Sequence, residues 1–198
     1  MKKMLLIAGL VVVGVVLLCA IFFGGAYNSL VTSEEAVKGS WAQVENVYQR
    51  RSDLVPNLVE TVKGYAAHEK QTLQGVVDAR SKISQMNISP GIVNDPEALA
   101  KFQALQGQLS SALSRLLVVV EQYPDLKASQ NFLALQTQLE GTENRISVER
   151  KRFNDASQVF NTLRRTFPSV LVANMMGFKE KAYFQADEGA AKAPAVKF

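Results

Sequence analysis

The sequence predicts an all-α protein, with an N-terminal transmembrane helix followed by an antiparallel helical bundle of about four long helices. Two patterns carry this prediction. Residues 4–23 form an uncharged, strongly apolar run, and beyond it apolar residues recur at alternating spacings of three and four along most of the chain. That spacing averages 3.5 residues, which is typical of helices that pack at a shallow angle as in coiled coils and bundles. No strand-like alternation of apolar and polar residues competes with it.

The run 4–23 has the length and composition of a membrane span. An α-helix of this length rises about 30 Å, the thickness of the hydrocarbon core of a bilayer. A cleaved signal peptide has a shorter apolar region, roughly 7–15 residues, and a small-residue cleavage site, for which Gly24 and Ala26 are only a weak candidate. Cys19 does not indicate a lipoprotein, because Leu18 precedes it where a small residue is expected. We therefore expect an uncleaved anchor, with the lipid bilayer as partner of residues 4–23.

The charges beside this run predict the orientation of the chain. Lys2 and Lys3 precede it, whereas the first basic residue after it is Lys38, which follows two glutamates. Under the positive-inside rule, residues 1–3 are cytoplasmic and the rest lies outside the cytoplasm. We expect a single-pass protein of the cell (inner) membrane, with a periplasmic or extracytoplasmic bundle domain over residues 27–185. The small, polar, proline-bearing end of the chain predicts a flexible tail over residues 186–198.

Turn and cap signals divide the bundle domain. Residues 87–96, NISPGIVNDP, predict a loop, and Asp95 is expected to cap the next helix with Pro96 in its first turn. The pairs Tyr123-Pro124 and Phe167-Pro168 predict two further helix ends, because the residue before a proline is disfavoured in the α region.

Pro56 admits two interpretations. Ser52 or Asp53 is a good N-cap, which would place Pro56 in the first turn of a new helix, where its missing N–H costs nothing. The alternative is one long helix kinked at Pro56. We favour a chain reversal near Ser52, because it gives four helices of more comparable length.

Six segments spread over nearly the whole chain match those of a known family. They are YNSLV (27–31), WAQVENVYQRRSDLVPNLVETVKGYAAHE (41–69), Arg80 in DAR, EQYPDLKASQNFLALQTQLEGTENRI (121–146), ERKRFNDASQVFN (149–161) and FPSVLVANMMGF (167–178). In these segments the chain resembles the LemA family. The resemblance implies an N-terminal membrane helix and a helical bundle outside the cytoplasm, and it implies no particular biochemical activity. A protein of the magnetosome membrane belongs to the family, which suggests a role in membrane organisation. Genes of the family often lie beside membrane-protein quality-control genes, which suggests a role in envelope quality control.

The composition argues against most catalytic and binding chemistry. The net charge of +4 arises from scattered basic and acidic residues, so we expect no nucleic-acid partner. The chain has one cysteine and one histidine, and His68 beside Glu69 lacks the motif context of a catalytic base. We therefore expect no catalytic residue, no cofactor and no metal. A metal- or ligand-binding bundle that uses the inward carboxylates Glu34, Glu69 and Glu149 is the alternative.

Charged residues on the apolar stripes are better explained as structural ion pairs. A charge removed from water needs a partner, and such pairs can fix the register of packed helices. The candidates are Arg50, Arg51, Glu69, Arg80 and Glu149.

The segment Phe167–Phe184 is apolar, rich in methionine and poor in charge. It is expected to be a terminal helix folded over the end of the bundle, an oligomer contact, or a hydrophobic shoulder that touches the membrane. The interface candidates are Phe167, Val170, Leu171, Met175, Met176 and Phe178. We expect a membrane-anchored, non-enzymatic scaffold that self-associates as a homo-oligomer or holds other membrane proteins.

Overall fold

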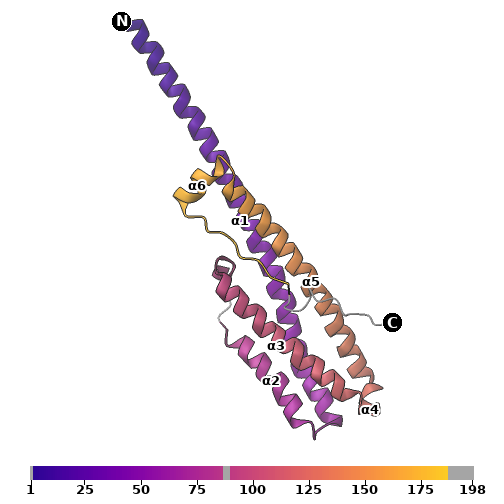
Figure 1. Cartoon of the computed structure of the whole chain (residues 1–198). Helices are drawn as coiled ribbons and strands as arrows, with labels where there is room; N and C mark the ends of the chain where they lie inside the picture. The colour runs from indigo at the N-terminus through magenta and orange to yellow at the C-terminus, as the bar shows by residue number, and fades with distance from the viewer. Residues whose placement is uncertain (1, 87–89, 187–198) are drawn as a thin grey trace, which may run out of the picture.

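The computed structural model describes residues 2–86 and 90–186, and over these residues the chain is helical without any strand (Figure 1). The predicted fold class is therefore confirmed. The elements in chain order are α1 (Lys2–Tyr65), α2 (Lys70–Ser84), the 3-10 helix η1 (Pro90–Asn94), α3 (Pro96–Val120), α4 (Pro124–Lys127), α5 (Gln130–Arg165) and α6 (Ser169–Met176). Residues 87–89 of the predicted loop and nearly all of the predicted tail lie outside the described residues.

The first third of α1 projects from the bundle as a single free helix (Figure 1). Large apolar side chains between Leu6 and Phe23 are exposed along it, and the first buried apolar side chain after them is Ala26. Among the described residues, α1 is the one helix long and apolar enough to cross a membrane. At 1.5 Å per residue, its 64 residues extend about 96 Å, so roughly two thirds of it lies beyond the apolar run.

The predicted reversal near Ser52 is wrong, because α1 continues through Pro56 to Tyr65. A proline inside a helix leaves the carbonyl four residues earlier without its N–H donor. Here that carbonyl belongs to Ser52, and Arg80 Nε on α2 donates to it over 3.0 Å. The lost helical hydrogen bond is thus replaced from a neighbouring helix. The chain reverses instead in the turn at residues 66–69.

The other helices pack along the distal two thirds of α1. The longest of them, α5, runs antiparallel to α1, while α2 and α3 form a second layer and α4 closes the distal end (Figure 1). Local sequence signals predicted two of these helix boundaries. The carboxylate of Asp95 accepts from the backbone N–H groups of Glu97 and Ala98 at 3.0 and 3.1 Å, which caps α3. Pro124 separates α3 from α4, and a second, unpredicted break precedes Gln130.

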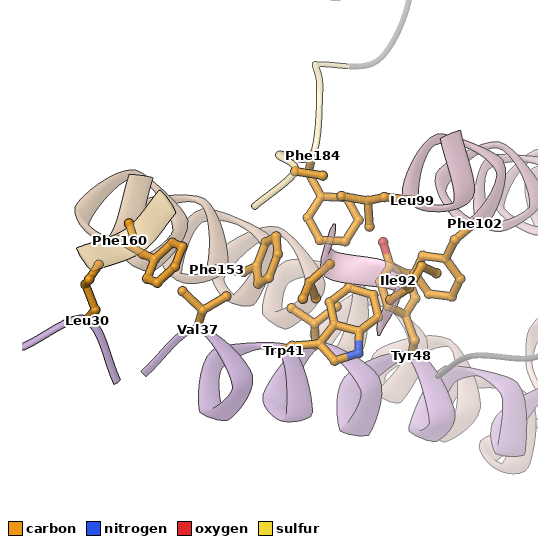
Figure 2. Packing of buried hydrophobic residues seen from close by; sticks show 14 of the residues in the cluster. Leu30, Val37, Trp41, Tyr48, Ile92, Leu99, Phe102, Phe153, Phe160 and Phe184 are labelled. Carbon is orange, nitrogen blue, oxygen red and sulfur yellow. The ribbon is translucent and has the colours of Figure 1, made fainter. Parts of the chain in front are cut away.

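The apolar core consists of two clusters stacked along the bundle. The cluster nearer the free end of α1 is aromatic, with Trp41 in ring contact with Phe102, Phe153 and Phe184 (Figure 2). The distal cluster is mostly aliphatic and is formed by the C-terminal half of α1 with α2, α3, α4 and the start of α5. Five α1 residues that follow the predicted spacing of three and four are buried in the aromatic cluster: Leu30, Val37, Trp41, Val44 and Tyr48.

The C-terminal part of the described chain is an extended segment, residues 177–186, which we call the strap. Gly177 ends α6 in the left-handed conformation with φ 75°, which favours glycine. The strap then runs back along the bundle (Figure 1), and Ala182 N–H donates to the carbonyl of Val93 over 2.8 Å. Phe184 reaches the aromatic cluster from the strap (Figure 2).

Candidate functional site

A buried polar layer separates the two core clusters, and Arg51 is its centre. Arg51 lies on α1 between Tyr48 and Val55, and only 2% of its surface is exposed. Its Nη1 donates to Ser110 Oγ on α3 and to Glu143 Oε2 on α5, both over 2.9 Å. Its Nη2 donates to the carbonyl and the side-chain oxygen of Gln106. One guanidinium therefore joins α1, α3 and α5.

The positive charge of Arg51 is balanced by a carboxylate near the surface of the bundle and not by one in the core. The guanidinium lies over the Tyr48 ring, 5.1 Å from its centroid, which is a cation–π arrangement. Its acidic partner Glu143 is 57% exposed, so this carboxylate keeps much of its hydration. A charge-assisted pair of this kind fixes which faces of the helices meet more than it adds stability.

An open groove of about 1090 Å³ lies above this layer, between α3, α5 and the strap. Arg51, Gln106, Ser110 and Glu143 line it from the layer, and strap residues 179–183, 185 and 186 also line it. The lining combines polar and apolar surface, and the groove joins the buried arginine to the surface. Of the predicted ion-pair residues, Arg51 lines this groove.

Lys181 is the second buried cation and fastens the strap to the bundle. Its Nζ donates to Glu34 Oε1 over 2.5 Å and to Asn94 Oδ1 over 2.7 Å, and it lies 4.7 Å from the centroid of the Phe160 ring. The side chain is 2% exposed, whereas that of Glu34 is 23% exposed. This contact joins residues 147 positions apart in the sequence.

Side-chain amides hold the backbone of the strap in place of a neighbouring strand. Asn161 accepts from the N–H of Lys181 and donates to its carbonyl, at 2.8 and 2.9 Å. Asn154 makes the same pair of bonds with Phe184, both at 2.9 Å. Gln103 makes a third such pair with Gln185. Each amide satisfies both backbone groups of one residue, as a strand partner would.

The remaining ion-pair candidates lie apart from the polar layer. Arg50 is exposed on the outer face of α1. Arg80 donates to the Ser52 carbonyl, as described above. Glu149 accepts from Arg152 Nη1 over 2.8 Å on the same helix. Glu69 accepts from the Tyr123 hydroxyl over 3.0 Å at the distal end, and this hydrogen bond raises the pKa of the phenol.

The structure does not bring the three inward carboxylates together. Glu34 and Glu69 are separated by most of the distal part of α1, which is about 45 Å at 1.5 Å per residue. Each carboxylate, Glu149 included, has a different partner within the protein. Among the described residues, no group of three or more histidine, cysteine or acidic side chains is placed to hold a metal ion. His68 is exposed in the turn between α1 and α2.

The interface candidates gather on α6 and its flanks. Phe167, Leu171, Met175 and Met176 are exposed, with Phe167 the most exposed at 81%. Val170 and Phe178 are partly buried. The opposite side of α6 buries Val172 and Ala173 against α1 and α5.

Several residues of the site escaped the sequence analysis. Gln106 stands on the stripe of α3, four residues after Phe102, so a polar residue at a core position was an available signal. Asn154 and Asn161 are seven residues apart and each follows a core phenylalanine, which is a second such signal. The sequence around Lys181 gave no such signal, because the partners of Lys181 come from distant parts of the chain.

Comparison with known proteins places this arrangement in a family. The model of the LemA family matches residues 40–198. The chain is 29% identical to the magnetosome protein MamQ of Magnetospirillum gryphiswaldense over 174 residues, which cover 80% of this chain and 64% of that protein. It is 29% identical over 175 residues to the magnetosome protein MamQ 2 of Paramagnetospirillum magneticum, with the same coverage.

A further relative is the protein LemA of Metamycoplasma hominis, 26% identical over 164 residues, which cover 83% of this chain and 71% of that protein. The chain thus spans just under two thirds of the length of the magnetosome proteins it matches. The family model begins within α1 and includes the polar layer, the groove and α6. Since it covers well over half of the chain, the chain belongs to the LemA family.

Proposed function

We propose that the protein is a membrane-anchored, non-enzymatic scaffold that presents a rigid helical bundle at the extracytoplasmic face of the membrane. The observation that carries this proposal is the continuity of α1, which joins the apolar run 4–23 to the bundle without a linker. A flexible linker would let the bundle tumble, whereas a continuous helix holds it in one direction from the bilayer. This rigid connection favours the presentation of one surface of the bundle to neighbouring proteins in the same membrane.

The buried contacts support a rigid bundle. Arg51 joins three helices and Lys181 fastens the strap, so both sites specify one arrangement of the elements. Anchoring restricts the protein to a plane and raises its local concentration, so weak side-by-side contacts are sufficient for assembly. We propose self-association into a homo-oligomer or the holding of other membrane proteins. Two relatives are named as magnetosome proteins, which supports a role in membrane organisation.

Lys2 and Lys3 support a cytoplasmic N-terminus, and with that orientation the bundle domain, residues 27–185, would lie outside the cytoplasm. The protein would then be a single-pass protein of the inner membrane. The alternative, a metal- or ligand-binding bundle, would need Glu34, Glu69 and Glu149 in one cavity. Their separate positions and separate partners favour the scaffold.

The first experiment is to measure the mass of the full-length protein after gentle extraction in detergent, beside a version that begins at Ala26. Circular dichroism and the emission of Trp41 would check that the shorter version is folded. A discrete assembly that is lost without the membrane helix supports a planar scaffold. A monomer in both forms contradicts self-association, and the search then turns to a captured partner or a bound ion.

A further inference from the structure

The outer face of α6 is an apolar surface at the end of the bundle nearest the membrane helix. Leu171 and Met175 are four residues apart on α6 and share one face of it, and Phe167 lies in the turn that leads into the helix; we call these three residues, in chain order, the stripe. They are 81%, 62% and 65% exposed. Phenylalanine, leucine and methionine this exposed and this close together are unusual unless another apolar phase covers them.

The register between α5 and α1 fixes the height of this stripe. The rings of Trp41 and Phe153 are in contact, with centroids 5.5 Å apart, so these residues are level in the antiparallel pair. Tyr27 lies 14 residues before Trp41, and Phe167 lies 14 residues after Phe153. Phe167 is therefore approximately level with Tyr27. The ring contact between Tyr27 and Phe178, 6.1 Å between centroids, independently places the end of α6 at the same height.

That height falls within the headgroup layer of a bilayer. Tyr27 is four residues after Phe23, the last residue of the apolar run, which corresponds to about 6 Å along the helix. Each interfacial layer of a membrane is about 5–8 Å thick beyond the hydrocarbon core. Interfacial helices bury their apolar face about 5–10 Å into this layer and the adjoining acyl chains. The side chains of the stripe are thus within reach of lipid.

The charged residues around α6 also favour contact with lipid. Between Arg164 and Glu180 the chain has three basic residues and one acidic residue. Arg164 and Arg165 precede the stripe and Lys179 follows it, and the exposed Arg165 is paired with Glu180. Basic side chains at the edge of an interfacial helix interact with anionic headgroups. Tyr27 adds an aromatic ring at the level where such rings are enriched in membrane proteins.

We propose that α6 is a second membrane contact, which rests in the lipid headgroup layer with Phe167, Leu171 and Met175 directed into the bilayer. This proposal rests on the membrane anchoring proposed above. The membrane helix sets the axis of the bundle but leaves it free to rotate about α1. A contact beside the helix fixes that rotation, so that a defined side of the bundle faces its neighbours.

The test uses the full-length protein in vesicles of phosphatidylcholine and phosphatidylglycerol. In a Cys19→Ala background, an environment-sensitive fluorophore is attached to single cysteines from Phe167→Cys and Met175→Cys. The matched controls are Val159→Cys and Val118→Cys, which are 63% and 68% exposed on α5 and α3. Val159 is eight residues further from the membrane on the helix that precedes α6, and Val118 is near the distal end.

We expect blue-shifted emission at positions 167 and 175, and loss of that emission when lipids carry a nitroxide near the headgroup end of their acyl chains. The fluorophores at both control positions should emit as they do in water, and the nitroxide should not quench them. Flotation of the vesicles separates this outcome from the anchoring itself. If the protein floats with the vesicles but the fluorophores at positions 167 and 175 behave like those at the control positions, the second membrane contact is refuted and the membrane anchor is retained.

Two other results also overturn it. Blue-shifted emission at positions 167 and 175 that is insensitive to the nitroxide and weakens as the protein is diluted in lipid indicates a second copy of the chain on the stripe. If the protein does not float with the vesicles, the membrane anchoring is contradicted, and so is the second membrane contact that depends on it.

Discussion

Arg80 Nε donates a 3.0 Å hydrogen bond to the carbonyl oxygen of Ser52, the group that Pro56 leaves without its helical donor. This relationship lets α1 continue for nine residues past a proline. Arg80 is partly buried on α2 and reaches the carbonyl from outside the helix. The donor is charged, and hydrogen bonds with a charged partner are stronger than neutral ones. The continuity of α1 thus depends on tertiary contact with α2.

The first prediction is an energetic coupling between Pro56 and Arg80. Arg80→Met should lower the free energy of unfolding of the bundle by about 1.5–3 kcal/mol, because the Ser52 carbonyl loses the hydrogen bond from the Arg80 side chain. In a Pro56→Ala background the new N–H can bond that carbonyl, so the same substitution should cost about 1 kcal/mol less. Urea unfolding, followed by the emission of Trp41, gives the four values of the double-mutant cycle. Strictly additive effects would contradict this explanation of the continuous helix.

A second prediction concerns the buried arginine of the polar layer. Arg51→Met removes the hydrogen bonds to Gln106, Ser110 and Glu143 and should lower the free energy of unfolding by about 2–3 kcal/mol. The effect stays below that of a fully buried broken pair, because Glu143 retains contact with water. The matched control is the adjacent, exposed Arg50→Met, with an expected change within about 0.5 kcal/mol. Equal effects at both positions would refute the structural role of Arg51.

A third prediction concerns pH and the exposed pair at the strap. The hydrogen bond from Arg165 Nη2 to Glu180 Oε1, 2.5 Å long, lowers the pKa of the Glu180 carboxyl below its usual value. A carboxyl whose pKa is lower in the folded state stabilises the fold above its unfolded-state pKa, and this contribution is lost as the pH falls through the folded-state pKa. The stability difference between the wild type and Glu180→Gln should therefore shrink in that acidic range.

The pair is solvent-exposed, so its contribution should also decrease at high salt. Arg165→Met should remove the same pH dependence, and adding Glu180→Gln to it should change nothing further. Urea unfolding of the three variants across the acidic range provides the measurement. A pH dependence that survives in Arg165→Met would show that another group causes it.

Local patterns predicted much of the fold because they act within one element. The apolar run, the stripe from Leu30 to Tyr48, the Asp95 cap and the break at Pro124 each depend on neighbours a few residues away. Pro56 was misread for the opposite reason, since the donor that compensates it lies 28 residues ahead on another helix. Propensity favours a break there, and only the tertiary contact overrides it.

The site was harder to predict than the fold. Arg51 stood out as a charge next to the apolar stripe, but its partners lie 55 to 92 residues away, and periodicity cannot select among the acidic and amide groups of a facing helix. The strap has no periodic pattern, because side-chain amides rather than a strand pair with its backbone.

The strap yields the last prediction, through Lys181 and the ring of Phe184. Phe184 stacks on Trp41 with 6.1 Å between ring centroids and 20° between ring planes, so the sole tryptophan reports on the strap (Figure 2). Lys181→Met breaks the bonds to Glu34 and Asn94 and should lower the free energy of unfolding by about 2 kcal/mol. Glu34 then keeps the longer, 3.9 Å contact with Lys38 but no longer holds the strap. The strap should therefore loosen, which shifts the emission of Trp41 to the red and speeds cleavage near Lys179 by trypsin. The exposed Lys179→Met serves as the control for emission and stability, and a similar red shift in that variant would contradict the fastening role of Lys181.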